Sequence, residues 1–478
     1  MENENTVKKS NFADMVLDYF KGFKVLKDTG REYWGIQIIN FLDCTAYFAM
    51  LSISSIFLSE EIGMDDKAAG YAITVFTTAT TLFLFISGTV TDWLGIRKSL
   101  YLTMIGNFIT RLAVVLLAMG PAFEGRGFAV TIALLLQAPF MAGIQTIFQT
   151  SNKRYTSKKS RSAGFSLWYL FMNVGAAAGG FSIDIIRKGL GLANTHIYTM
   201  SAGLAIICLI LGLIMIRTNE AYEKEEETEL EKEKAKEKKN PWQIAKEVIT
   251  HRVFWRFVII ISLLLGVRAV FSYMYLLFPK FWLRIIGENA SIGFYQGLNP
   301  ILIIIGLILF IPFANRYNVF KMLVFGAMIS SACLFVIAIP YSWLGMSLPS
   351  ATHLLVIISI IVLSIGEIIW SPKYYEFVGA IAPKGQEGTY LGFSQIPWFG
   401  AKTVVSFFSG HMLIKWCPEG IAEKIVNNEV SFWNTPNAMW LILGTIAIVG
   451  VLACLVFKGW LTRGVDYEAK EPKKEAEV

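Results

Sequence analysis

The chain has 478 residues, of which 54% are hydrophobic and only 17% charged, and its formal net charge is +7. Soluble proteins carry about 25% charged residues, so the composition argues against a soluble protein. The positive charge does not predict nucleic-acid binding, because the basic residues lie in short segments between long apolar runs and form no basic face. The composition predicts a protein embedded in a lipid bilayer.

The apolar runs are long enough to cross a membrane as helices. About 20 apolar residues in a helix span the hydrocarbon core, and a helix satisfies its backbone hydrogen bonds internally, as lipid requires. We therefore expect an all-α membrane protein with about twelve spans. In chain order the expected spans are residues 33–59, 68–90, 99–120, 128–150, 163–187, 197–217, 253–280, 292–313, 319–340, 353–380, 388–412 and 436–459.

Polar segments flank and divide these spans. Residues 1–32 contain no apolar stretch of the kind a cleavable signal peptide needs, so the first span is expected to remain in the protein. Residues 218–252 contain a run of interleaved Glu and Lys that is typical of a solvated linker. The linker separates two predicted six-helix bundles, residues 33–217 and 253–460, and a charged tail, 461–478, follows. Duplicated transporters are organised in this way.

Lysine and arginine gather in alternate connections between the spans. Arg97, Lys98, Lys153 and Lys384 lie in connections on one side, whereas the connection at 60–67 on the other side is poorer in basic residues. Basic connections stay on the cytoplasmic side of a membrane. The sequence thus predicts a multi-pass protein of the cell's inner (plasma) membrane with both termini in the cytoplasm.

No motif indicates an enzyme, a metal or a cofactor. The five cysteines lack metal-ligand spacing, and the four histidines lie near expected span ends without clustering. No glycine-rich phosphate loop joined to Lys-Ser/Thr is present, so we do not expect transport driven directly by ATP. We expect no catalytic residues and no cofactor.

The connection after the second span has a distinctive spacing, with Gly88, Asp92, Gly95 and Arg97. This pattern fits a short connection whose Asp faces a helix N-terminus or an Arg, a contact that can latch one conformation and break in another. It resembles the signature loop of the major facilitator superfamily. A weaker copy, residues 313–321, follows the eighth span.

Four further passages resemble the proton-dependent oligopeptide transporters, which are peptide/proton symporters. They lie at residues 168–175, 296–305 and 320–328, and in the tenth span, where Gly366-Glu367 is followed by Ser371-Pro372. The resemblance covers most of the chain, with the passages in the correct order. It implies a twelve-helix major facilitator fold with pseudo-two-fold symmetry and a substrate held between the halves.

The same resemblance implies which residues bind the substrate. Asn173, Asn299 and Glu367 match the positions that bind a substrate amino group in this family. Tyr47 and Tyr169 match aromatic residues that line the cavity. These five residues are candidate substrate ligands.

The first and fourth spans depart from the family pattern. Where the family has Glu-x-x-Glu-Arg in span one, this chain has Asn40, Asp43 and Cys44. Where it often has Lys in span four, the best match is Gln145. The two missing basic residues are those the family uses around the substrate carboxylate. The residues that match the family's binding site for the substrate amino group are therefore present, whereas those that match its binding site for the substrate carboxylate have changed.

Charged residues within the spans point to a wet cleft between the halves. Each costs at least about 2.5–3.5 kcal/mol in a bilayer unless it has a partner or faces water. Glu367 and Asp43 are candidates for proton coupling, with a structural contact as the alternative. Arg268 and Lys402 are candidates to bind an anionic group or to act as counter-ions, against structural pairing. Arg111 is expected to snorkel or to pair structurally.

These features predict a secondary active transporter, monomeric, that takes up peptides or small amine-bearing solutes with protons by alternating access. One alternative is an exporter or facilitator of another small organic solute that has lost peptide recognition. Another is a non-transporting membrane receptor or scaffold that binds a cytoplasmic partner through the charged linker.

Overall fold

A computed structural model describes residues 21–157, 160–219, 265–314, 318–381 and 396–461, with single residues at 255, 259 and 262. Within these ranges the chain is helical and contains no strand. In chain order the helices are α2 (Arg31–Glu60), α3 (Asp66–Met119), α4 (Arg126–Arg154), α5 (Arg161–Asp184), α6 (Thr195–Met215), α10 (Leu265–Leu276), α11 (Phe278–Ile286), α12 (Ile292–Ala314), α13 (Val319–Ile337), α14 (Leu348–Ile381), α16 (Ile396–Trp416), α17 (Ile421–Val426), α18 (Pro436–Val456) and α19 (Lys458–Leu461). Single 3-10 or π turns lie at Phe23–Asp28, Ile185–Gly189, Tyr341–Leu344 and Phe432–Asn434.

The predicted spans coincide with helices within the described residues, and the seventh span is bent. In the described residues nine helices are long and apolar enough to cross a membrane, or up to ten if the pair α10 and α11, bent by 53°, is one span. The second and third spans together make up α3, which turns sharply at Gly95 (φ 77°, ψ 160°). Both arms lie against the same part of α4, because Ser87 hydrogen-bonds to Thr146 and Thr103 lies against Gly143. The predicted short connection between spans two and three is therefore confirmed at Gly95. Most of 253–264, and 388–395, lie outside the described residues, as does most of the linker.

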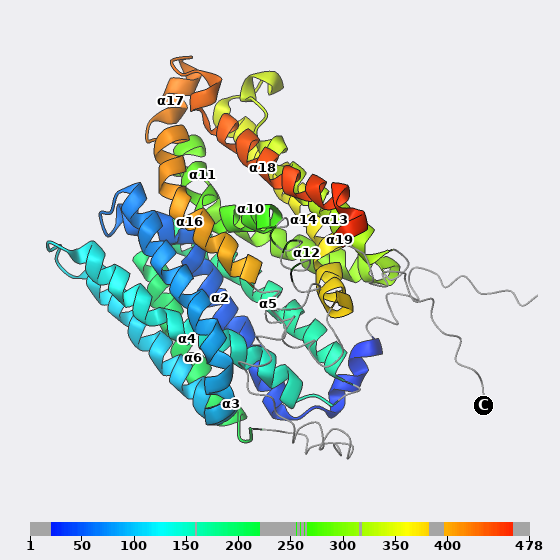
Figure 1. Ribbon diagram of the computed structural model, residues 1–478. Helices are drawn as coiled ribbons and strands as arrows, with labels where there is room; N and C mark the ends of the chain where they lie inside the picture. Colours follow the sequence, from blue (N-terminus) through cyan, green and yellow to red (C-terminus); the bar gives the residue numbers. More distant parts are fainter. Residues whose placement is uncertain are drawn as a thin grey trace, which may run out of the picture.

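The helices form two bundles that are related by a pseudo-two-fold axis. In the first, α3 packs on α4 and α6, and α2 packs on α5 and α6; in the second, α13 packs on α14 and α18, and α10 packs on α16 (Figure 1). The main contacts between the bundles are α5 with α12 and α3 with α16. These contacts join span five to span eight and span two to span eleven. The two contacts are equivalent by the pseudo-symmetry, because spans five and eleven are counterparts in the two bundles, and so are spans two and eight. The predicted fold class is confirmed.

The two bundles are joined on one side of the membrane. We call the side at which α6 ends the linker side, and the side at which α2 ends the opposite side. Every ion pair that joins the bundles within the described residues lies on the opposite side. There Asp66 of α3 contacts Lys280 and Arg284 of α11, with 2.8 Å to the Arg284 guanidinium. From this region the two sets of helices diverge toward the linker side (Figure 1).

Glycine residues bring α5 and α12 into backbone contact on the same side. A Cβ atom added to Gly180 would lie 2.6 Å from the Gly297 nitrogen and 2.9 Å from the Gly293 oxygen. Beside them, the Asp184 carboxylate accepts hydrogen bonds from the backbone N–H groups of Gly293, at 2.9 Å, and Phe294, at 2.8 Å. Close packing and helix capping together hold the bundles against each other.

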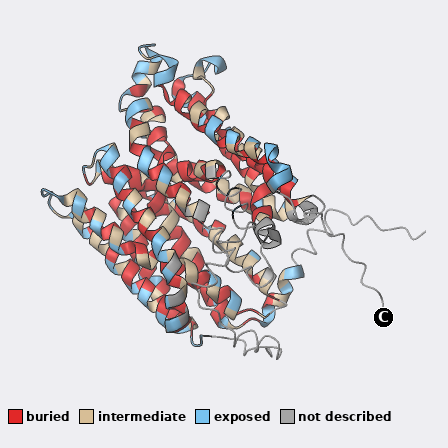
Figure 2. Cartoon of the chain, in the orientation of Figure 1, coloured by how far each residue is buried: buried red, intermediate tan, exposed pale blue. Residues whose placement is uncertain are grey.

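Large apolar side chains cover the outer surface, while the buried residues gather inside each bundle and between the bundles (Figure 2). Leu116 is 62% exposed, Phe128 is 73% exposed and Val456 is 78% exposed. So much exposed apolar surface is unfavourable in water and favourable against lipid tails. The surface agrees with a multi-span membrane protein.

We expect Gly180→Ala to lower the midpoint of thermal unfolding of the detergent-purified protein. The added methyl group meets backbone atoms that have little freedom to move, and overpacking of this kind costs roughly 1–3 kcal/mol. Gly203→Ala on α6 is the matched control, because no atom lies within 4 Å of a Cβ there. Equal midpoints for the two variants would contradict the importance of the α5–α12 contact.

Candidate substrate-binding site

Glu367 and Asn299 meet between α14 and α12. The Asn299 amide nitrogen donates to the Glu367 carboxylate at 3.2 Å and to the Ser364 hydroxyl at 3.0 Å. No Lys or Arg in the described part of the chain lies within ion-pair distance of Glu367. Two of the three residues expected at the amine end of the site are therefore in contact, and the carboxyl group forms no direct ion pair within the described residues.

Asn173 lies on α5 at a similar depth but makes a local contact. It is 7% exposed, and its amide nitrogen donates to the Tyr169 backbone oxygen at 2.9 Å. One helical turn away, the Ala177 backbone oxygen lies 3.3 Å from the Cβ position of Gly297, which is half a turn from Asn299. The α5–α12 contact thus brings Asn173 near the level of Asn299, although no direct hydrogen bond joins them in the described residues.

Arg268 on α10 is enclosed by aromatic rings. Its guanidinium carbon lies 4.5 Å from the ring centroid of Trp370, 4.6 Å from that of Tyr374 and 5.2 Å from that of Trp398. The residue is only 7% exposed. Its guanidinium has no hydrogen-bond acceptor or ion-pair partner among the described residues, and its charge acts on Glu367 at longer range. The rings stabilise the cation and leave its N–H donors available.

Lys402 on α16 connects this group to the first bundle. Its ammonium group donates to the hydroxyl of Tyr47 on α2 at 2.9 Å and lies 4.9 Å from the ring centroid of Trp398. The residue is 4% exposed. Arg268 and Lys402 therefore both contact the indole ring of Trp398. Three of the predicted site residues are gathered at the boundary between the bundles.

Tyr275 on α10 is a site residue that the sequence argument missed. Its ring packs on Phe48 of α2 with 5.4 Å between centroids, and its hydroxyl lies within electrostatic range of Glu367, Tyr47 and Tyr169. It is two helical turns from Arg268.

Two of the aromatic residues around Arg268, Trp370 and Tyr374, were missed as well. Trp370 and Tyr374 lie three and seven residues after Glu367, on one face of the tenth span, and Tyr275 lies seven residues after Arg268. Residues at this spacing share one side of a helix. The signal that identifies them is helical periodicity counted outward from each buried charge.

Two of the three residues that replace the family's charges in span one, Asn40 and Cys44, are neutral and bonded to each other. The Cys44 thiol donates to the Asn40 side-chain oxygen at 3.4 Å, and the Asn40 amide nitrogen donates to the Trp168 backbone oxygen at 3.1 Å. Gln145 on α4 is partly buried and has no described side-chain hydrogen bond. The first bundle thus offers no free cation at these positions, and the positive charges near Glu367 come from the second bundle.

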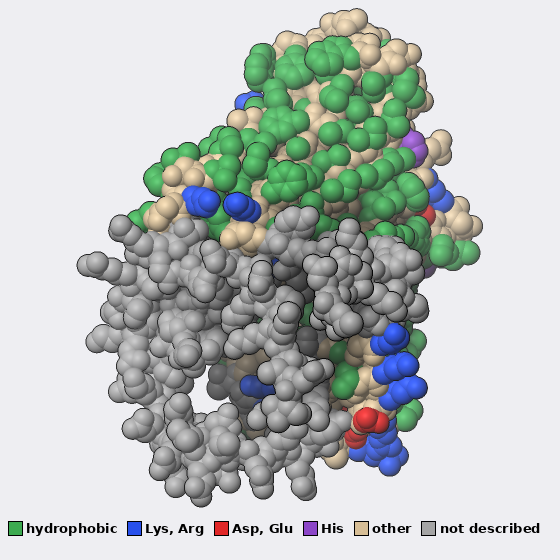
Figure 3. Space-filling model, turned by 90° about the vertical axis from the view of Figure 1, so that its right-hand side faces the viewer, with side chains coloured by type: hydrophobic (Ala, Val, Ile, Leu, Met, Phe, Trp, Pro, Cys, Tyr) green, Lys and Arg blue, Asp and Glu red, His purple; other side chains and the backbone are tan. Residues whose placement is uncertain are grey.

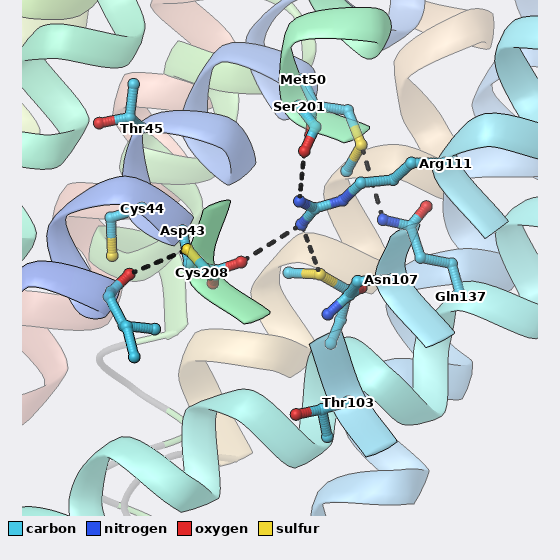
Figure 4. Close-up of polar contacts among 12 residues, drawn as sticks. Asp43, Cys44, Thr45, Met50, Thr103, Asn107, Arg111, Gln137, Ser201 and Cys208 are labelled. Atoms are coloured by element: carbon cyan, nitrogen blue, oxygen red, sulfur yellow. Dashed lines mark hydrogen bonds and ion pairs between the residues drawn. The ribbon is translucent and has the colours of Figure 1, made fainter. Parts of the chain in front are cut away.

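Asp43 lies inside the first bundle and pairs with Arg111. The guanidinium nitrogen is 3.4 Å from one carboxylate oxygen, and the two side chains are 1% and 0% exposed. Arg111 also donates to the Ser201 backbone oxygen at 3.0 Å and to the Met141 sulfur at 3.3 Å. Figure 4 shows the pair held among α2, α3, α4 and α6. Arg111 is paired and does not snorkel.

The glycine and arginine of the expected latch contact the end of α6. A Cβ on Gly95 would lie 2.8 Å from the Asn219 side chain, and the Arg97 guanidinium donates to the Arg217 backbone oxygen at 2.9 Å. Gly88 is less crowded, with only a Thr146 methyl group at 3.9 Å from its Cβ position. The side chain of Asp92 lies outside the described residues. The observed latch contacts join α3 to the end of the first bundle and the start of the linker, and within the described residues none reaches the second bundle.

Comparison with known proteins agrees with this architecture. The profile of the Major Facilitator Superfamily matches residues 35–404. The chain belongs to the Major Facilitator Superfamily. No curated protein sequence matches it. Its fold is that of a transporter rather than an enzyme.

Solved structures of low sequence identity share the fold. The POT family transporter PepTSo matches with a TM-score of 0.67 at 15% identity, covering 91% of this chain and 99% of that chain. A POT family transporter in complex with 5-aminolevulinic acid matches with a TM-score of 0.65 at 14% identity, covering 91% and 97%. A D-xylose–proton symporter matches with a TM-score of 0.66 at 12% identity, covering 92% and 99%. At these identities the likeness concerns the fold alone.

Thermal unfolding of single and double variants tests the Asp43–Arg111 pair. Arg111→Met is expected to destabilise the protein strongly, because it leaves a buried carboxylate without its partner, which costs about 3–5 kcal/mol. Adding Asp43→Asn should recover most of the loss, since no uncompensated charge remains. A double variant at least as unstable as the sum of the two single variants would show that the two side chains do not interact.

Proposed function

We propose that this protein is a secondary active transporter that takes up peptides or small amine-bearing, peptide-like solutes together with protons, by alternating access. One observation carries the proposal. The carboxylate of Glu367 and the guanidinium of Arg268 lie within electrostatic range, and neither has an ion-pair partner within the described residues. Opposite charges held apart inside a membrane bundle favour a ligand that carries both charges.

In the proposed binding mode the two charges take the two ends of the solute. The amino group binds Glu367 and Asn299, and a carboxylate or similar anion binds Arg268, whose planar fork suits two parallel hydrogen bonds. Lys402 lies beside the anionic end. Asn173, Tyr47, Tyr169 and Gln145 line the remainder of the site.

The known structures support the solute class without fixing its identity. One similar POT family transporter was solved with 5-aminolevulinic acid, a small amino acid, and a peptide transporter POT was solved with sulfate. Both charges that our binding mode requires are therefore represented among ligands of proteins with this fold. The neutral Asn40 and Cys44 pair in the first bundle favours recognition of the anion by the second bundle.

Protons couple to transport through Glu367 and Asp43 in this proposal. A proton on Glu367 removes the charge that attracts the amine, so substrate and proton compete for one group. A proton on Asp43 weakens its hold on Arg111, which also bonds the backbone of α6 and the sulfur of Met141 on α4. Protonation at this point changes how α2 packs within the first bundle.

The conformation of the protein fits one step of an uptake cycle. Because basic connections mark the cytoplasmic side, we assign the linker side to the cytoplasm and both termini with it. The observed closure on the opposite side then corresponds to an inward-facing state in a plasma membrane. We propose that Gly88, Asp92, Gly95 and Arg97 act as a latch when the linker side closes, in a monomer.

A second candidate is an exporter or facilitator of another small organic solute. The D-xylose–proton symporter fits the fold about as well as the POT structures do, with TM-scores of 0.66 and 0.67. This candidate predicts no dependence on an amine or on Glu367.

Transport by purified protein in liposomes tests the proton coupling. With an inward proton gradient, the native protein should accumulate an amine-bearing solute, and Glu367→Gln should abolish accumulation while it retains exchange of labelled for unlabelled solute. Glu423→Gln on α17 is the control, because that carboxylate is exposed on the opposite side and forms no ion pair within the described residues. If the gradient changes the accumulation of no peptide, amino acid or amine, the coupling is wrong.

Binding measured by thermal shift tests the anionic end of the site. Arg268→Gln should weaken binding of a solute with an amine and a carboxylate by roughly ten- to a hundredfold, since hydrogen bonds to charged groups contribute about 1.5–3 kcal/mol. The affinity of Arg268→Lys should lie between those of the native protein and Arg268→Gln, because lysine keeps the positive charge but cannot donate two parallel hydrogen bonds. The carboxamide of the same solute should bind all three proteins equally weakly. A carboxamide that binds the native protein as tightly as the acid contradicts the proposal.

A further inference from the structure

A groove lies on the outer surface of the second bundle, away from the candidate substrate site. It has a volume of about 180 Å³ and runs between the start of α13 and the end of α18 with α19. Phe320 and Val324 are both 2% exposed and form its floor, while Phe325, 60% exposed, and Leu455, 43% exposed, form its sides. The groove faces lipid because its side residues belong to the apolar outer surface.

Two lysines lie at the linker-side end of this groove. Lys321 is in the first turn of α13 and Lys458 begins α19, and both line the groove and are exposed. Asn318 caps α13 by accepting from the Lys321 backbone N–H at 3.1 Å, so the positive end of the helix dipole lies at the same place. Three sources of positive charge therefore meet at one end of an apolar groove.

The groove changes character along α13 as a lipid molecule changes from headgroup to tail. Phe325 is about one turn from Lys321. Met328, which also lines the groove, is about 10 Å from Lys321 along the helix axis, deeper in the membrane. Figure 3 views the molecule from the side of α13 and α19 and shows basic side chains at the lower edge of a broad apolar surface. A soluble anion would leave the apolar part of the groove without a contact, and an uncharged lipid would leave the two lysines without an anionic partner.

We propose that this groove binds an anionic phospholipid of the linker-side leaflet. Its phosphate and headgroup charge bind Lys321 and Lys458, and one acyl chain lies against Phe325, Met328 and Leu455. Basic residues beside a membrane surface attract anionic lipids, and each contributes to the affinity. The bound lipid joins the first turn of α13 to the end of α18. This site is independent of the proposed transport function.

Native mass spectrometry of the full-length protein in detergent tests the proposal, with phosphatidylglycerol and phosphatidylcholine of identical acyl chains as probes. The native protein should bind phosphatidylglycerol at least about tenfold more tightly. The double variant Lys321→Ala/Lys458→Ala should bind phosphatidylglycerol roughly ten- to thirtyfold more weakly and lose the preference. Leu455→Trp, which fills the groove without changing charge, should weaken both lipids.

The control removes two exposed lysines of the linker side that do not line the groove, as Lys27→Ala/Lys153→Ala. It should keep the native preference for phosphatidylglycerol. Equal binding of the two lipids by the native protein overturns the proposal, and so does a preference that survives in Lys321→Ala/Lys458→Ala. Glycerol phosphate, which has the headgroup chemistry without the acyl chains, should not compete; competition at equal concentration would assign the groove to a soluble anion instead.

Discussion

The cost of placing a charge in a medium of low dielectric organises this protein. Each ionisable side chain in the bundles must find a partner, a ring face or water. Asp43 and Arg111 find each other inside the first bundle, and Asp66 finds Arg284 where the bundles close. Arg268 instead lies among three aromatic rings, and Glu367 accepts from a neutral amide. Within the described part of the chain, Arg268 and Glu367 have no ion-pair partner, and both lie toward the boundary between the bundles, where a ligand can supply one.

The charges that are paired at the closed side and the charges of the candidate site have different roles in the proposed cycle. The pairs at Asp66 and at Asp184 hold the opposite side closed together with backbone contacts at glycine, so the closed side depends on contacts that need little side-chain volume. The candidate site lies deeper, where α2 of the first bundle meets α10, α14 and α16 of the second through the Lys402–Tyr47 hydrogen bond and the Phe48–Tyr275 contact. Relative rotation of the bundles therefore changes the site and the closure together.

Local rules were enough to predict most of the helices, and they failed where distant contacts decide. The short connection at Gly95 was predicted because glycine and charged residues are typical of one. The sequence did not indicate that the Arg97 side chain and backbone bond to Arg217 and Asn219, which are far away in sequence. Arg111 illustrates the same limit, since nothing near it in the sequence indicates that its partner is Asp43 on another helix.

Hydropathy and the energetics of each residue in lipid were enough to predict the membrane environment, the two-bundle organisation and the buried charges. Which charges neutralise each other and which remain for a ligand depends on the tertiary structure. Three contacts depend on how separate helices are rotated against each other: Asn299 with Glu367, Trp398 with both Arg268 and Lys402, and Asp43 with Arg111 inside the first bundle. Rotation about a helix axis is set by packing against neighbours, and a pattern of apolar residues on every face leaves it undetermined.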